Sequence, residues 1–161
     1  MKETLTTIEK ALFLKELEFF SQVGIEQAAE IAALAEEVHF EPGHVIFRAS
    51  DPSAHVFLVI EGNIIAEKDG IVTTVIGAGK GFGDLTLTPE GLYGFDARTV
   101  EHTHVLRFSI DDLVETMHEH PEMAVGMVRA LALRLREASQ QLADLGRQLQ
   151  DSPPCGEDPS S

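Results

Sequence analysis

The middle of this chain is a series of short stretches rich in Val, Ile, Phe and Thr. Turn residues, such as Glu61-Gly62-Asn63 and Asp69-Gly70, separate the stretches. Short strands joined by tight turns are typical of antiparallel sandwiches and barrels. The sequence therefore predicts an antiparallel β-structure with strands at residues 38–40, 44–48, 56–61, 63–68, 71–76, 93–100 and 102–108.

Helical periodicity flanks this region on both sides, which makes the predicted fold class α+β. Apolar side chains recur every three to four positions in residues 6–17 and 25–37, as in amphipathic helices. The expected buried faces are Ile8, Ala11, Leu12, Phe13 and Leu17 in the first helix, and Ala28, Ala29, Ile31, Ala32, Leu34 and Ala35 in the second. A third helix is predicted at residues 110–118, because Ser109 and the acidic Asp111 and Asp112 suit a helix N-terminus.

A long helix is predicted at residues 121–150, where proline at position 121 fits the first helical turn. From Ala124 onward its apolar positions are spaced alternately by four and three residues over more than three heptads. Such an a/d seam needs a partner helix, and a helix of about 45 Å, at ~1.5 Å per residue, outreaches a small barrel. We therefore predict a homodimer; a helix that faces only its own core is the alternative. The predicted interface is Val128, Leu131, Leu135, Ala138, Leu142, Leu145 and Leu149.

Charge and cysteine content argue against several function classes. The chain has 12 basic and 27 acidic residues, a net charge of −15, so DNA and anionic membranes would be repelled. Cys155 is the single cysteine, which excludes an intrachain disulfide and a structural thiolate zinc site and favours a reducing compartment. Charged residues interrupt the apolar N-terminus, unlike a signal peptide or a spanning helix. We expect a cytoplasmic protein with no DNA or membrane partner.

The order of the elements and the motif GKGFGDL at residues 79–85 resemble the cyclic nucleotide-binding domain family of catabolite-activator-like regulators, cyclic-nucleotide-dependent kinases and channels. The resemblance covers about residues 5–145, including FEPGHVIFRASDPSAHVFLVIEGNI (40–64) and HVLRFSIDDL (104–113). It implies a jelly-roll-like β-roll, an antiparallel double-stranded β-helix, between N-terminal helices and a long C-terminal helix. The expected organisation is a β-roll domain with its N-terminal helices at 1–120, a dimerisation helix at 121–150, and a disordered Pro/Ser/acidic tail at 151–161.

The resemblance also implies a regulatory function, with cyclic AMP or cyclic GMP as the ligand. In the family's dimeric regulators a DNA-binding helix-turn-helix follows the long helix. Only eleven residues remain after Gln150, so no such module is expected here. We expect the regulatory domain to act on a protein partner, which the sequence does not identify. The chain has no nucleophile elbow and no pair of carboxylates with an interpretable spacing, so we expect no catalytic residue and no enzyme activity.

The family's ligand motif implies specific contact residues. In the family a glutamate after the glycine loop holds the ribose, and an arginine nine or ten residues later pairs with the phosphate. Here the acidic position holds Asp84, and the arginine position falls on Tyr93 or Gly94. The implied ligand contacts are Gly83, Asp84, Leu85, Tyr93 and Gly94.

The missing arginine lowers the expected affinity. Losing one partner of a buried charged pair costs about 2–5 kcal/mol, so we expect weak, altered or lost cyclic nucleotide binding. The alternative is a ligand-free interaction or scaffold domain whose pocket is filled by side chains such as Tyr93 and Phe95. Of the nearest basic residues, Arg98 is an odd number of strand positions from Tyr93 and is expected on the opposite face. Lys80 would reach the pocket only if the glycine loop rearranged.

A pair of histidines opens a third interpretation. His102 and His104 stand two apart on a predicted strand, a spacing also found in metal-dependent small-barrel enzymes of the cupin type. The residues that follow the pair lack the glutamate that such enzymes require, and surface histidines are the ordinary alternative. We therefore expect no metal ligand among the histidines.

Overall fold

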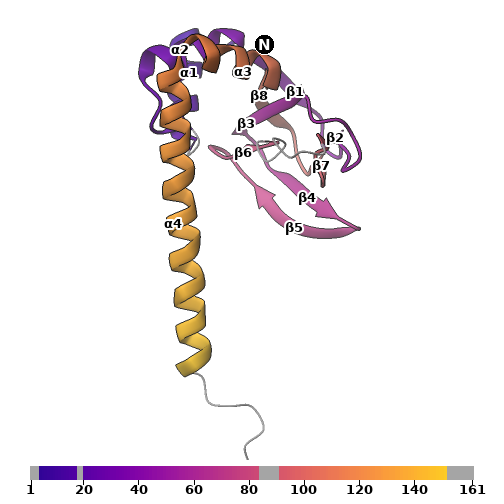
Figure 1. Ribbon diagram of the computed structural model, residues 1–161. Helices are drawn as coiled ribbons and strands as arrows, with labels where there is room; N and C mark the ends of the chain where they lie inside the picture. Colours follow the sequence, from indigo (N-terminus) through magenta and orange to yellow (C-terminus); the bar gives the residue numbers. More distant parts are fainter. Residues whose placement is uncertain (1–3, 18–19, 84–90, 152–161) are drawn as a thin grey trace, which may run out of the picture.

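The computed structural model describes residues 4–17, 20–83 and 91–151 (Figure 1). The helices are α1 (Thr7–Glu16), α2 (Ile25–Leu34), α3 (Ile110–Glu119) and α4 (Pro121–Asp151). The strands are β1 (Glu36–Phe40), β2 (Val45–Phe47), β3 (His55–Glu61), β4 (Ile64–Lys68), β5 (Ile71–Ile76), β6 (Gly81–Phe82), β7 (Asp96–Thr99) and β8 (Thr103–Ser109).

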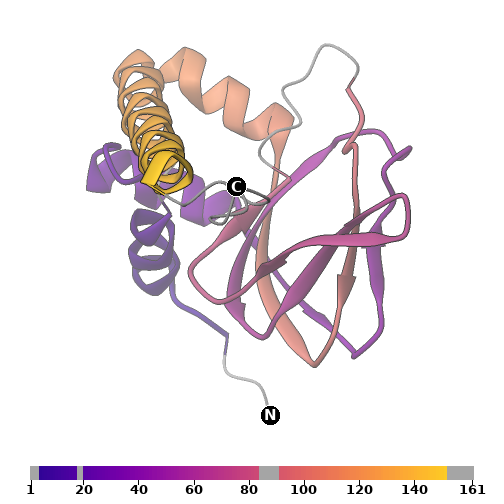
Figure 2. The same cartoon turned by 90° about the horizontal axis from the view of Figure 1, so that it is seen from below.

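The strands form two four-stranded antiparallel sheets. One sheet has the order β1-β8-β3-β6 and the other β2-β7-β4-β5. Figure 2 shows the sheets as a β-roll, with the helices gathered to one side. The α+β class and the β-roll expected from the sequence are therefore confirmed. Each predicted strand region contains an observed strand, whereas β6 is two residues long and leaves no periodicity in the sequence.

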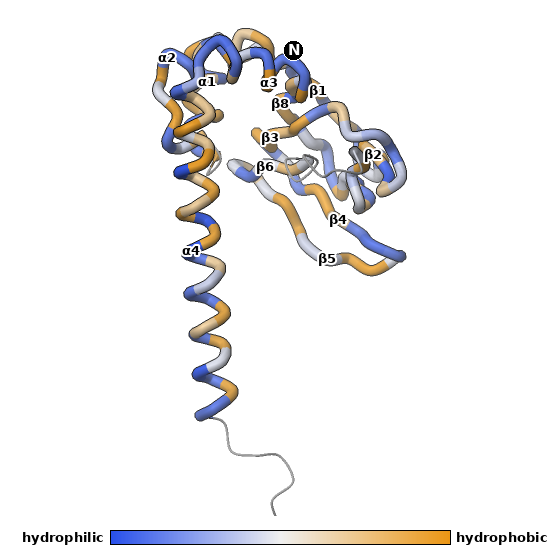
Figure 3. Tube along the Cα trace, viewed as in Figure 1, coloured by the Kyte–Doolittle hydropathy of each residue, from blue (hydrophilic) through white to orange (hydrophobic). Residues whose placement is uncertain are grey.

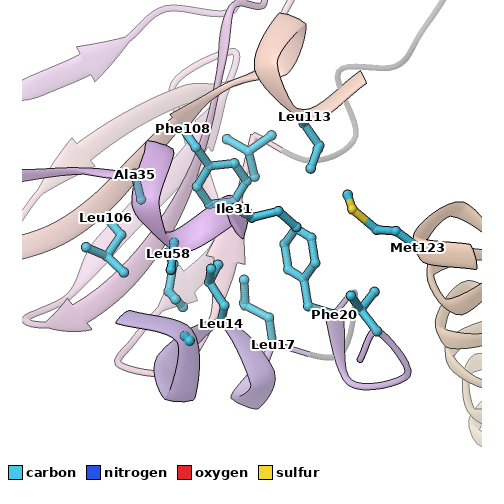
Figure 4. Close-up of a cluster of buried hydrophobic side chains, with 14 of the residues drawn as sticks. Leu14, Leu17, Phe20, Ile31, Ala35, Leu58, Leu106, Phe108, Leu113 and Met123 are labelled. Atoms are coloured by element: carbon cyan, nitrogen blue, oxygen red, sulfur yellow. The ribbon is translucent and has the colours of Figure 1, made fainter. Parts of the chain in front are cut away.

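The sheet that contains β3 is covered on both faces, because its strands carry apolar side chains on both. Phe57 and Val59 point into the space between the two sheets, where they pack with Phe82 and Val105. The alternate residue Leu58 packs instead in a second cluster, formed with the helices (Figure 4). A strand that is buried between two layers, here the other sheet and the helices, needs apolar side chains on both of its faces.

The first helix begins with a capping box: the Thr6 hydroxyl accepts a hydrogen bond from the Glu9 amide at 3.2 Å, and the Glu9 carboxylate accepts one from the Thr6 amide at 2.7 Å. The predicted apolar face of α1 is wrong in part. Leu14 is fully buried, whereas Ile8 and Leu12 are 74% and 56% exposed. The face that contacts α2 and the sheet is thus rotated from the predicted one.

The second helix is shorter than predicted and ends at Leu34, which is half exposed rather than buried. Ala35 takes an extended conformation, and β1 starts at Glu36. Residues Glu36–Phe40 pair in register with β8, from Arg107 back to Thr103. The ladder of backbone hydrogen bonds to β8 therefore overrides the helical pattern of the sequence between positions 35 and 37.

The last helix is buried against the rest of the described chain in its first turns. Its buried residues are Met123, Gly126, Met127 and Ala130, and Met123 points toward the cluster that contains Phe20 and Ile31 (Figure 4). A Cβ atom on Gly126 would lie 2.6 Å from the Gln22 carbonyl oxygen, so only glycine allows this approach. Beyond Ala130 the helix runs past the roll (Figure 1).

The α4 helix ends at Asp151; the rest of the tail predicted to be disordered, residues 152–161, lies outside the described residues. Among the helices of the described ranges, none combines the length and the apolar character needed to cross a membrane.

Candidate functional site

A cavity of about 620 Å³ lies between the β-roll and α4. Its walls come from the β4–β5 hairpin, the segment that includes β6, the segment before β7, and one side chain of α4. The lining residues are Ala66, Lys68, Thr73, Thr74, Val75, Ile76, Lys80, Gly81, Phe82, Gly83, Leu92, Tyr93, Gly94, Phe95 and Arg134.

Three of the five predicted contact residues line this cavity together: Gly83, Tyr93 and Gly94. The other two, Asp84 and Leu85, lie outside the described residues. Backbone hydrogen bonds fix the segment before β7, because the Tyr93 amide donates to the Asp51 carbonyl at 3.2 Å and the Gly94 amide donates to the Ala49 carbonyl at 2.9 Å.

Gly83 is required by its surroundings as well as by its backbone conformation. Its φ of +83° lies in the left-handed region that favours glycine. A Cβ atom at this position would lie 2.8 Å from the His55 carbonyl oxygen and 3.5 Å from Cε1 of Tyr93. The glycine loop therefore packs directly against the Tyr93 side chain.

Tyr93 forms part of the cavity wall and is itself only 8% exposed. Its ring stacks on Phe47 with centroids 3.7 Å apart and planes 9° apart. Its hydroxyl accepts hydrogen bonds from the amides of Ala54 and His55, at 3.3 and 3.1 Å, and lies 3.3 Å from the His55 carbonyl, to which it donates. The residue at the family's arginine position thus directs its polar atom toward the backbone of β3.

The placement of Lys80 corrects the prediction that the loop would have to rearrange, because Lys80 lines the cavity in the observed conformation. The backbone on either side of it is held to β3: the Val59 amide donates to the Lys80 carbonyl, and the Gly79 amide donates to the Val59 carbonyl, both at 2.9 Å. Arg98 is absent from the lining and pairs with Glu67 at 2.6 Å, on the face opposite its buried neighbours Ala97 and Thr99.

Arg134 on α4 also lines the cavity and was missed by the sequence analysis. The sequence signal that could have indicated Arg134 was its position immediately before Leu135 of the predicted seam. With Lys68 and Lys80 it gives the cavity three basic side chains, and no acidic side chain occurs among the described lining residues. This local excess of positive charge contrasts with the net charge of −15 for the whole chain.

Of the predicted histidine pair, His104 lies in β8 and His102 directly precedes this strand, whereas His39 lies in the neighbouring β1. The ring of His39 stacks on both, with centroids 4.0 Å from His104 and 5.4 Å from His102. Nε2 of His104 is 3.1 Å from a carboxylate oxygen of Glu37. Within residues 4–17, 20–83 and 91–151, no three His, Cys, Asp or Glu side chains are arranged to hold a metal ion.

His55 is the residue whose backbone is hydrogen-bonded to the Tyr93 hydroxyl. The surroundings of its imidazole disfavour a positive charge. Burial lowers the pKa of His55 below its ordinary value, and the charge of Arg107 lowers it further, while the Glu36 carboxylate acts in the opposite direction. The hydrogen bond and the charge of Arg107 in turn lower the pKa of Glu36. His55 is therefore biased toward its neutral form.

Comparison with known proteins identifies the family. The model of the cyclic nucleotide-binding domain matches residues 37–120, just over half of the chain. The chain belongs to the cyclic nucleotide-binding domain family. The matched region contains α3 and all of the β-roll except Glu36, the first residue of β1, and the described lining of the cavity lies within it apart from Arg134.

Relatives in this family support the assignment. The chain is 28% identical over 139 residues to a CRP-like cAMP-activated global transcriptional regulator of Mycobacterium tuberculosis. The match covers 80% of this chain but only 62% of the regulator. The N-terminal domain of a transcriptional regulator from Streptomyces coelicolor superposes with a TM-score of 0.70 at 27% identity, covering 80% of this chain and 95% of that one. For the catabolite activator protein of Thermus thermophilus the TM-score is 0.63 at 25% identity, with coverages of 80% and 63%.

Proposed function

We propose that this chain is a regulatory, non-enzymatic domain whose cavity takes a ligand of the cyclic nucleotide class with weak or altered affinity. The observation that carries the proposal is the cavity itself, because Gly83, Tyr93 and Gly94, picked out by the family motif, line it together. The cAMP-activated regulator of Mycobacterium tuberculosis, which the chain resembles over most of its length, supports cyclic AMP as the first ligand to test.

The altered affinity follows from Tyr93. A tyrosine whose hydroxyl is bonded to the backbone of β3 gives a phosphate no positive charge. Removing one partner of a buried charged pair costs about 2–5 kcal/mol, which at about 1.4 kcal/mol per decade lowers the affinity roughly 30- to 3,000-fold. A domain that has lost this pair binds cyclic nucleotides in the millimolar range if its relatives bind them in the micromolar range.

The domain is further proposed to form a homodimer through α4. The residues of the predicted seam are exposed, and the exposed fractions of its valine and leucines run from 44% for Leu131 to 77% for Leu149. Leu135, Leu142 and Leu145 lie beyond Ala130, the last buried residue of the helix. Figure 3 shows apolar residues recurring along this free part of α4.

A second copy of the chain is the occupant that suits this seam. The positions that flank it are Ala132, Ser139 and Gly146 on one side and Arg134, Gln141 and Gln148 on the other. Arg134 is the only charged residue among these six. When two identical helices pair along this seam, their flanking positions therefore bring few like charges together. Flanking positions that all carried charges of one sign would repel each other.

Regulation would act through the position of α4. The helix contributes Arg134 to the cavity and carries the seam on its free part. A ligand that contacts both the roll and Arg134 favours one placement of the helix, and a protein partner that binds this placement detects the ligand.

Calorimetry tests the ligand proposal. The wild-type chain and a Tyr93→Arg variant are titrated with cyclic AMP and cyclic GMP at millimolar concentration. Weak wild-type binding that tightens in Tyr93→Arg supports the proposal. If the wild type shows no nucleotide binding and Tyr93→Arg binds, the pocket is intact but the natural sequence does not bind the nucleotide.

If neither protein binds a cyclic nucleotide, the result favours the alternative function, a ligand-free interaction or scaffold domain. The observation that favours this alternative is the burial of Tyr93 against Phe47, which fills the space at the arginine position. Circular dichroism of both proteins shows whether the variant keeps the fold, so that silence is not mistaken for unfolding.

A further inference from the structure

We propose that Lys80 and Arg134 form an anion site that holds the phosphate of a nucleotide ligand between the β-roll and α4. This inference rests on the proposed function, in which the cavity takes such a ligand, and it assigns the phosphate to two cations outside the family's arginine position. The two residues come from different parts of the fold, the turn before β6 and the middle of α4.

The charge of the cavity supports an anionic ligand. Three of its described lining residues are basic and none is acidic, although acidic residues outnumber basic ones 27 to 12 in the whole chain. Clefts lined by one sign of charge attract ligands of the opposite sign. Among the described lining residues, the sign of the charge is therefore opposite to that of the whole chain, whose net charge is −15.

The backbone next to Lys80 is fixed, which gives the site a defined position on the roll. Hydrogen bonds join the Gly79 amide and the Lys80 carbonyl to the two backbone groups of Val59 in β3, and the Lys80 amide donates to the Gly77 carbonyl at 3.2 Å. Val59 is fully buried. The backbone hydrogen bonds of Lys80 therefore hold this residue at the cavity that it lines.

Arg134 supplies the second half of the site. Its planar guanidinium can donate two parallel hydrogen bonds to a phosphate, whereas the lysine ammonium acts as a point charge. It is the α4 side chain that lines the cavity in the described part of the chain. A phosphate held by both residues ties α4 to the roll one position away from Leu135 of the seam.

The remaining lining indicates what the anion is attached to. The lining also includes apolar residues, among them Val75, Ile76 and Phe95, and two threonines, Thr73 and Thr74. A cavity of about 620 Å³ lies within the range typical of small-molecule sites. A phosphate ester with a planar, partly polar base matches this combination better than a simple inorganic anion.

The test compares Lys80→Gln and Arg134→Gln with the matched control Arg136→Gln. Arg136 lies two positions after Arg134 on α4 and is not among the described residues that line the cavity. All three residues are exposed, and thermal melts check that each variant is folded. Each protein is titrated with cyclic AMP, cyclic GMP and inorganic pyrophosphate by calorimetry.

The expected result is that Lys80→Gln and Arg134→Gln each weaken nucleotide binding by about tenfold or more, while Arg136→Gln weakens it by less than about threefold. Added salt should weaken wild-type binding more than binding by either variant, because fewer charges then contribute.

The remaining outcomes separate the inference from the proposed function. If a nucleotide binds and neither variant weakens it, the inference is overturned while the proposed function stands. If no nucleotide binds, the ligand proposal fails, and the pyrophosphate titration then decides whether Lys80 and Arg134 form an anion site. Pyrophosphate binding that is lost in Lys80→Gln and Arg134→Gln supports the anion site, and silence toward pyrophosphate as well overturns it.

Discussion

Replacing Leu142 by alanine should dissociate the proposed dimer. Leu142 is 69% exposed in the single chain and lies well beyond Ala130, the last buried residue of α4. Burying a whole leucine side chain contributes about 1.5–3 kcal/mol, so an exposed fraction of about two thirds makes about 1–2 kcal/mol available per chain. A symmetric dimer loses this twice, about 2–4 kcal/mol, which corresponds to a roughly 30- to 700-fold weaker association.

Sedimentation equilibrium measures this effect directly. The wild type, Leu142→Ala and the control Leu133→Ala are compared from about 1 µM to about 1 mM, a range that spans about three decades of dissociation constant. Leu133 is 44% exposed but lies on the face of α4 opposite the seam, so its replacement should leave the association unchanged. A monomeric wild type at the highest concentration, or equal shifts in both variants, would refute the seam as the interface.

Three further predictions concern the fold around the cavity and α4. Tyr93→Phe should lower the free energy of unfolding by about 1–3 kcal/mol, because backbone groups of β3 lose a buried partner; urea denaturation showing no loss would contradict this. Because burial holds the pKa of His55 below 6.5, the unfolded chain takes up the proton first as the pH falls below that value. The free energy of unfolding should therefore decrease on acidification, and less steeply in His55→Gln; parallel pH profiles would argue against the assignment. Gly126→Ala should destabilise the fold by about 1–3 kcal/mol, since its Cβ would lie 2.6 Å from the Gln22 carbonyl oxygen. Gly146→Ala, with nothing within 4 Å, should stabilise α4 by about 0.5–1 kcal/mol, and thermal melts that move both variants in the same direction would contradict this pair.

Much of the fold could be predicted because the relevant signals are local. Alternation of apolar residues and turn residues between positions 38 and 108 located the strands, and Ser109 marked the start of α3, where its hydroxyl accepts from the Asp112 amide at 3.4 Å. The errors arose where tertiary contacts decide. Pairing with β8 ends α2 at Leu34, and packing against α2 and the sheet selects Leu14 rather than Leu12 as a buried residue of α1.

The candidate site was only partly predictable. Gly83, Tyr93 and Gly94 could be found because they lie in a contiguous motif that resembles the family. Lys80 was expected to reach the pocket only if the glycine loop rearranged, because the course of this loop depends on backbone pairing with Val59, which no sequence pattern reveals. Arg134 is about 40 positions from Tyr93 in the sequence, and only the packing of α4 beside the roll brings it to the cavity.

The central claim, that the cavity beside Tyr93 binds a nucleotide, is tested most directly by the tyrosine ring itself. The chain contains one tyrosine and no tryptophan, so protein labelled with ¹³C-tyrosine gives the ring signals of Tyr93 alone. During a titration with cyclic AMP, the account predicts a saturable shift of these signals that needs more ligand in Lys80→Gln. Ring signals that stay fixed up to the solubility limit of the nucleotide would contradict it.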